Sequence, residues 1–79
     1  MNKARRKVLR SVVEKMEEVA STIEDLYADE QSAFDNLPES LQYSDKGADM
    51  EEGIDLLSET LDTVRDYIGE LESTFLIGH

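Results

Sequence analysis

The chain has 79 residues, which is enough for one small domain whose core supplies only a few kcal/mol of net stability. It contains no cysteine and a single histidine, so disulfides and the usual zinc sites cannot support that core. Its 19 acidic and 8 basic residues give a net charge of −11, which disfavours binding to nucleic acid and favours basic partners.

The basic residues are concentrated at the start of the chain. Lys3, Arg5, Arg6, Lys7 and Arg10 lie among the first ten positions, where there is no acidic residue. Acidic residues and Lys15 interrupt the stretch that follows, so we interpret it as mature protein and not as a signal peptide. No apolar run approaches the roughly 20 residues of a membrane-spanning helix. We expect a cytoplasmic protein that does not bind membranes.

The first predicted element is an amphipathic helix over about residues 3–36. Its apolar residues recur three and four positions apart, which is typical of a helix with a coiled-coil seam. The predicted seam consists of Leu9, Val12, Met16, Val19, Ile23, Leu26, Ala33 and Leu37. Pro38 ends this helix, because proline lacks a backbone N–H and disfavours helical geometry at the residue before it.

Glu30 interrupts this seam at a position where an apolar residue is expected. A buried carboxylate is costly unless it is hydrogen-bonded, so we expect Glu30 to accept backbone N–H groups and to fix the turn. A catalytic or metal-binding role would need converging partners, and the nearest acids are Asp29, Asp35 and Asp49. The chain has no Glu-x-x-His pair for a di-metal bundle. We expect no enzymatic activity, no metal and no cofactor.

A second apolar row lies beside the seam of the first helix, at Val13, Ala20, Tyr27 and Phe34. It makes the apolar face wider than a two-helix hairpin needs. Three interpretations are open: the row completes a four-helix bundle in a homodimer, it binds a foreign protein, or it packs against the loop. We expect a homodimer.

A polar loop over residues 37–44 follows, in which Pro38 can start one short helical turn. The second helix is predicted over about residues 45–77, with Ser44 as N-cap, Asp45 in the first turn and Gly78 as a stop. Its seam is regular: Met50, Ile54, Leu57, Leu61, Val64, Ile68, Leu71 and Phe75.

The two seams match in antiparallel register, because the numbers of facing residues sum to a nearly constant value. Val19 with Val64 sums to 83, as does Leu26 with Leu57. The sequence therefore predicts an all-α protein in which residues 1–79 form one antiparallel, coiled-coil-like hairpin that dimerises into a four-helix bundle.

The outer face of the second helix carries carboxylates three or four positions apart. They are Asp45, Asp49, Glu52, Asp55, Glu59, Asp62, Asp66 and Glu70, which we call the acidic stripe. Solvated helix faces commonly have such a pattern. The other interpretation is imitation of DNA, since phosphates along one strand rise about 3.4 Å per nucleotide.

The segment from Asp29 to Leu57 reads DEQSAFDNLPESLQYSDKGADMEEGIDLL. Its acidic-Gln start, its DNLPESLQ turn, and Ser44, Gly47 and MEE-x-ID-x-L after that turn carry a resemblance. The segment resembles a family of small acidic helical-hairpin proteins of Gram-positive bacteria, their phages and mobile elements. The resemblance implies a helical hairpin of mobile-element origin and supplies no catalytic residue, and Gly53 departs from the helix-forming residue expected there.

Two functional hypotheses follow. The first is a non-enzymatic protein-interaction module, encoded by a phage or mobile element, that binds a host or phage protein. The alternative is an acidic nucleic-acid-mimicking inhibitor of a host DNA-binding or defence protein, of the anti-CRISPR or anti-restriction type; a metal-binding helical protein is a third and weaker hypothesis. The predicted partner-binding residues are Val13, Tyr27, Phe34, Asp45, Asp49, Glu52, Asp55, Glu59, Asp62 and Asp66.

Overall fold

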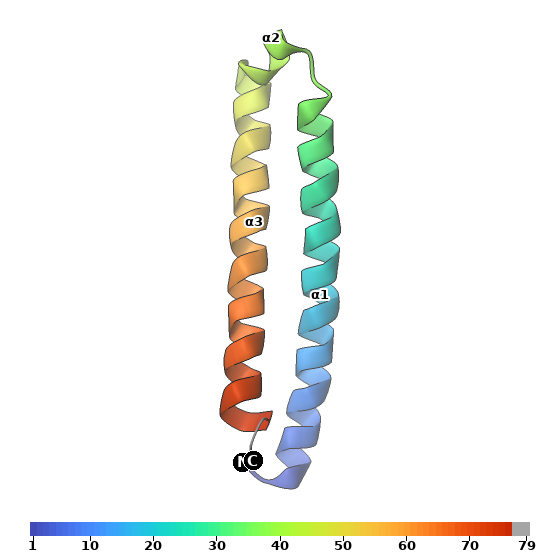
Figure 1. Cartoon of the computed structure of the whole chain (residues 1–79), viewed down its shortest axis with the longest axis vertical. Coiled ribbons are helices and arrows are strands. Elements are labelled where there is room, and N and C mark those ends of the chain that lie inside the picture. Colours follow the sequence, from blue (N-terminus) through green and yellow to red (C-terminus); the bar gives the residue numbers. More distant parts are fainter. Residues whose placement is uncertain (77–79) are drawn as a thin grey trace.

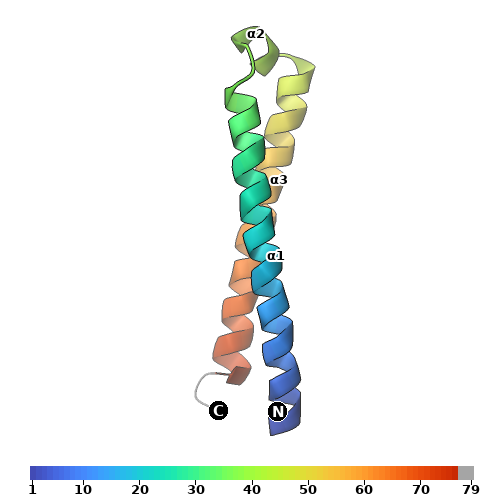
Figure 2. The same ribbon diagram turned by 90° about the vertical axis from the view of Figure 1, so that its right-hand side faces the viewer.

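The computed structural model describes residues 1–76, and these residues form helices without any strand. The predicted all-α class is therefore confirmed. Two long helices, α1 (Lys3–Asp35) and α3 (Asp45–Leu71), lie side by side and run in opposite directions (Figure 1). A short helix, α2 (Glu39–Gln42), connects them, and a π-helix, η1 (Glu72–Leu76), follows α3. The rod measures 57 × 15 × 15 Å, and η1 lies at the same end as the start of α1 (Figures 1 and 2).

Both ends of α1 follow from local sequence. Asn2 is the N-cap, and its side-chain oxygen accepts a hydrogen bond from the backbone N–H of Arg5 at 2.8 Å. The helix ends at Asp35, and the backbone N–H of Leu37 then donates to the carbonyl oxygen of Phe34 at 3.0 Å. The end lies one residue before the predicted one and just ahead of Pro38.

The predicted helical turn after Pro38 is present as α2. The Pro38 carbonyl accepts the backbone N–H groups of Leu41 and Gln42, at 2.8 and 3.1 Å. The Gln42 side-chain amide then donates to the carbonyl oxygens of Phe34 and Leu37, at 3.2 and 3.1 Å. Gln42 therefore ties α2 to the C-terminal end of α1, whose last carbonyls lack helical partners.

The start of α3 is as predicted, because the Ser44 hydroxyl accepts a hydrogen bond from the backbone N–H of Gly47 at 3.4 Å. Gly47 is buried where α2 meets the first turn of α3. A Cβ atom there would lie 2.0 Å from the Gln42 carbonyl oxygen and 2.6 Å from that of Leu41. Only glycine permits this close approach.

The far end of α3 differs from the prediction. The α-helix ends at Leu71, and Glu72–Leu76 continue as a π-helix. Residue 77, predicted as the last helical position, and the predicted stop Gly78 lie outside the described residues.

The core lies between α1 and α3. Its buried cluster consists of Val13, Ala20, Leu61 and Ile68, and the half-buried residues packed around it are Met16, Ile23, Val64, Leu71 and Leu76. On α3, the buried positions belong to the predicted seam. On α1 they do not, because Val12, Val19 and Leu26 of the predicted seam are 41%, 51% and 49% exposed. On α1 the prediction was confirmed for Leu9, Met16 and Ile23, which are half-buried, and was wrong for the row through Val12, because the row through Val13 is buried in its place.

The rotation of α1 has a physical reason. The row that begins with Val13 continues to Tyr27 and Phe34, and an aromatic side chain can bury about 150–250 Å². Had α1 faced α3 as predicted, Glu30 would have lain in the seam, where its carboxylate would have lost solvation. In the structure Glu30 is exposed and Phe34 is half-buried.

Candidate protein-interaction surface

The apolar row predicted to bind a partner is used inside the molecule. Val13 is 5% exposed and Ala20 is 4% exposed, and both pack against α3. Tyr27 and Phe34 are half-buried, and Phe34 and Ile54 of α3 line one shared depression. The row therefore packs mainly against α3, which none of its three interpretations included, and Val13 is not available to a partner.

A different apolar row is exposed instead. On α1, each of Val12 and Val19 directly precedes a buried residue, Leu26 continues this row seven residues after Val19, and Val8 lies one helical turn before Val12. On α3, Tyr67 likewise precedes a buried residue and is 56% exposed. We call these five residues, Val8, Val12, Val19, Leu26 and Tyr67, the open face.

The members of the open face lie on one side of the helix pair. In any α-helix, the residue directly before a buried residue points about 100° away from it around the helix axis, and the direction of this rotation is the same in every α-helix. When two antiparallel helices face each other, that sense leads to the same side of both. The half-buried Val64 of α3 lies between Tyr67 and the core, so it connects the α3 part of the open face to the buried cluster.

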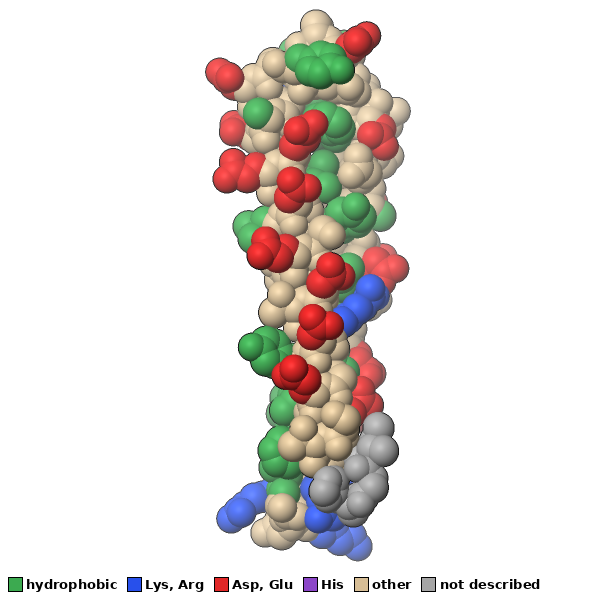
Figure 3. Space-filling view, turned by 60° about the vertical axis from the view of Figure 1, so that its left-hand side comes forward, with side chains coloured by type: hydrophobic (Ala, Val, Ile, Leu, Met, Phe, Trp, Pro, Cys, Tyr) green, Lys and Arg blue, Asp and Glu red, His purple; other side chains and the backbone are tan. Residues whose placement is uncertain are grey.

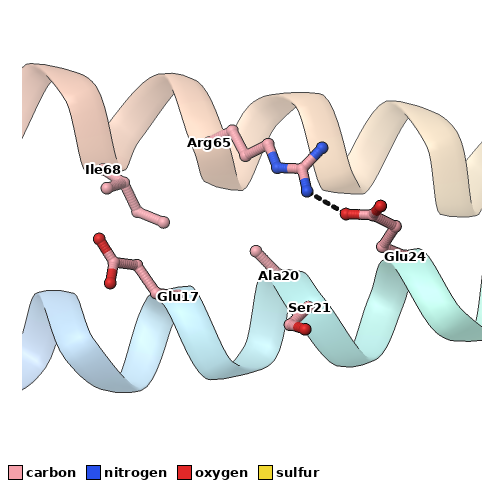
Figure 4. Close-up of a pocket in the computed structure, with 6 residues that line it drawn as sticks. All are labelled: Glu17, Ala20, Ser21, Glu24, Arg65 and Ile68. Carbon is pink, nitrogen blue, oxygen red and sulfur yellow. Dashed lines mark hydrogen bonds and ion pairs between the residues drawn. The ribbon is translucent and has the colours of Figure 1, made fainter.

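An ion pair marks the opposite side. Figure 4 shows Arg65 of α3 extending across to Glu24 of α1, and each follows a buried residue by four positions, which turns it the other way. The shallow depression around the pair is also lined by Glu17, Ala20, Ser21 and Ile68. Arg65 and Glu24 are each about half exposed, at 52% and 56% of their side chains, so solvent screens the pair.

The acidic stripe lies along α3. All eight of its carboxylates, from Asp45 to Glu70, are exposed, and within residues 1–76 none forms an ion pair. Figure 3 shows acidic side chains following one another along the rod, with hydrophobic side chains beside them and most of the visible basic side chains at one end. A depression at one edge of the stripe is lined by Leu56, Glu59, Thr60, Thr63 and Val64. The structure thus presents apolar and anionic surfaces next to each other.

Glu30 does not fix the turn, contrary to our expectation. It is exposed, and no hydrogen bond to its carboxylate occurs within the described part of the chain. Gln42 connects the turn to α1 instead. The role of Gln42 could not be predicted from the sequence, because it depends on where α2 folds back.

The described residues contain neither a cluster of potential metal ligands nor a helix that could span a membrane. Over residues 1–76, no three or more His, Cys, Asp or Glu side chains are grouped so that they could hold a metal ion. Across the same range, every helix is too short or too polar to cross a membrane. Comparisons with protein-family models, with curated proteins and with solved structures find no match.

Proposed function

We propose that the protein is a non-enzymatic protein-interaction module that binds its partner through the open face. The observation that carries this proposal is the exposed row of Val12, Val19 and Leu26, which repeats every seven residues on one side of α1. Aliphatic side chains at this spacing are the pattern by which one helix packs against another. The exposed Tyr67 supplies an aromatic contact beside them, and tyrosine is enriched at protein interfaces.

The finer architecture belongs to the same proposal. The antiparallel pair of α1 and α3 acts as a coiled-coil-like hairpin, and binding adds helices to it, as in a four-helix bundle. The partner is a second copy of the chain or a host or phage protein, and the resemblance of the segment from Asp29 to Leu57 supports an origin in a phage or mobile element. The cysteine-free composition suits a reducing cytoplasm.

The test compares two double variants that add the same charge to α1. Val19→Glu with Leu26→Glu alters the open face, whereas Ala28→Glu with Ser32→Glu alters exposed positions outside it. Sedimentation of the pure proteins and pull-down from the host lysate measure binding. We expect the first variant to lose every partner that the parent binds and the second to retain them. Equal binding by both variants would refute the proposal, as would a parent that binds no protein at all.

The acidic stripe favours a second candidate, in which the protein occupies a nucleic-acid-binding groove as a decoy. Eight exposed carboxylates along α3 support it. A decoy would compete with DNA for its target, and its binding would fall steeply as salt rises because the contacts are between exposed charges. It would also survive the open-face variant and fail after Glu52→Gln, Asp55→Asn and Glu59→Gln are combined.

A further inference from the structure

We propose that the partner of α1 is a second copy of α1, packed antiparallel across a two-fold axis that passes beside Val19. The inference rests on the proposed function, because it uses the same open face, and it names the occupant and its orientation.

The apolar row is symmetric about Val19. Val12 and Leu26 lie seven residues on either side of it, and all three are exposed. In an antiparallel pair of α1 helices, Val19 therefore meets Val19 and Val12 meets Leu26. A parallel pair would also match apolar residues with each other, so the apolar row alone does not decide the direction.

Charge decides the direction. The first ten residues carry five basic side chains and no acidic one, whereas the last turns of α1 contain Asp29, Glu30 and Asp35. A parallel pair would place the two basic ends side by side and the two acidic ends side by side. An antiparallel pair places each basic end against an acidic end. Like charges placed side by side are penalised, and complementary ends fix the orientation of the partners.

One specific ion pair follows from this register. Arg5 lies seven residues before Val12, so it continues the same row and is exposed. The residue opposite Arg5 in the second copy is Ala33, whose small side chain leaves room for a long neighbour. Glu30 of the second copy lies three residues from Ala33, which is about 4.5 Å along the helix axis and within reach of a guanidinium group. Glu30 thus pairs with Arg5 of the other copy.

The α3 helix is compatible with the same axis. Val64 packs against the core cluster that contains Ala20, so it lies at a similar height to Val19. Leu57 and Leu71 lie seven residues on either side of Val64 and are half-buried. A second copy related by the same axis would bring Leu57 opposite Leu71, so both helices of each copy present rows with matching symmetry.

Single-cysteine variants test the orientation directly, since the chain has no cysteine of its own. In the proposed dimer, two Val19→Cys copies face each other. Two Val12→Cys copies would be about 21 Å apart along the axis, at about 1.5 Å per residue. A disulfide needs Cα atoms only about 4.4–6.8 Å apart. Under mild oxidation we therefore expect V19C to crosslink with itself, V12C and L26C not to do so alone, and V12C mixed with L26C to give the mixed dimer.

The contrary outcomes are distinct. If V12C crosslinked with itself as fast as V19C does, the two α1 helices would be parallel or would associate without a fixed register. Ser21→Cys lies on the ion-pair side, so its crosslinking rate measures non-specific collision. If no variant crosslinks and the parent sediments as a monomer, the inference falls. The proposed function would still stand if V19E/L26E then abolished capture of a foreign protein, and it would fall as well if nothing were captured.

Charge reversal tests the ion pair by sedimentation over a range of protein concentrations. Arg5→Glu and Glu30→Arg should each raise the dimer dissociation constant by about tenfold, since each reverses two exposed ion pairs per dimer. The combined variant should return to within about threefold of the parent, because it restores both pairs with exchanged signs. Two single effects that simply multiply in the double variant would overturn the pairing of Arg5 with Glu30.

Discussion

Replacement of Gly47 by alanine tests how closely α2 packs against the first turn of α3. The new Cβ would lie 2.0 Å from the Gln42 carbonyl oxygen, whereas non-bonded heavy atoms prefer about 3.5 Å or more. The α2 backbone would have to retreat by about 1.5 Å, and Gln42 would then lose its hydrogen bonds to Phe34 and Leu37. Overpacking typically costs about 1–3 kcal/mol, and each lost hydrogen bond costs about 1 kcal/mol.

Alanine also favours the helix over glycine by about 0.5–1 kcal/mol, so the net loss of unfolding free energy should be about 2–4 kcal/mol. Such a loss removes most of the stability of so small a domain. Gly53→Ala and Gly69→Ala are matched controls, because a Cβ at either position meets no described atom within 4 Å. Both should be more stable than the parent.

Urea unfolding followed by circular dichroism, at one dilute protein concentration for all variants, measures these free energies. The expected order of midpoints is Gly47→Ala far below the parent, and both controls slightly above it. If Gly47→Ala were as stable as Gly69→Ala, the close approach of α2 to α3 would not exist in solution, and the account of Gly47 would be refuted.

Three further predictions use the same assay. Gln42→Ala should cost about 1–3 kcal/mol, because the carbonyl oxygens of Phe34 and Leu37 each lose one hydrogen bond. Glu30→Ala should change the stability of the dilute protein by less than about 0.5 kcal/mol, and equal losses would contradict this. Val13→Ala should lower the free energy of unfolding by about 1.5–2.5 kcal/mol, whereas Val12→Ala should lower it by less than about 1 kcal/mol, since only Val13 is buried. The reverse order would mean that α1 is rotated as the sequence predicts. Arg65→Ala should cost no more than about 1 kcal/mol, because its pair with Glu24 is exposed, and a larger loss would point to packing by its aliphatic stem.

The parts of the fold that depend on local chemistry could be predicted from the sequence. Pro38 limits α1, and Ser44 caps α3 because its hydroxyl is placed to accept the N–H three residues later. The predicted seam of α3 is confirmed, since Ile54, Leu61 and Ile68 are buried and Leu57, Val64 and Leu71 are half-buried beside them.

The orientation of α1 could not be predicted from periodicity. Two adjacent rows, one through Val12 and one through Val13, have the same seven-residue repeat and differ by about 100° around the helix. The choice between them depends on burying the aromatic residues Tyr27 and Phe34 and on keeping Glu30 in solvent. Hydrophobic periodicity records only which positions are apolar, so it includes neither the burial of the aromatic side chains nor the solvation of Glu30.

The assignment of Val13 to the partner-binding surface failed for the same reason. Once Val13 is assigned to the core, the row through Val12 and Val19 becomes the exposed one, so one error exchanged the interior and exterior rows of α1. Gly47 carried a readable signal, since glycine inside a helical pattern often marks a close contact. Gln42 carried none, because a glutamine in a polar turn has many possible partners until the chain is folded.

The single connection through α2 sets the order in which the molecule forms and opens. Phe34 and Ile54 lie near α2 and close a short loop when they meet, whereas Val13 and Ile68 must close a much longer one. The entropy cost of closing a loop grows with its length, so contacts between α1 and α3 should form first beside α2 and then extend toward the basic start of α1. Opening runs the other way: amide protons at the start of α1 and in η1 should exchange with solvent before those around Ala20 and Leu61 in the buried cluster.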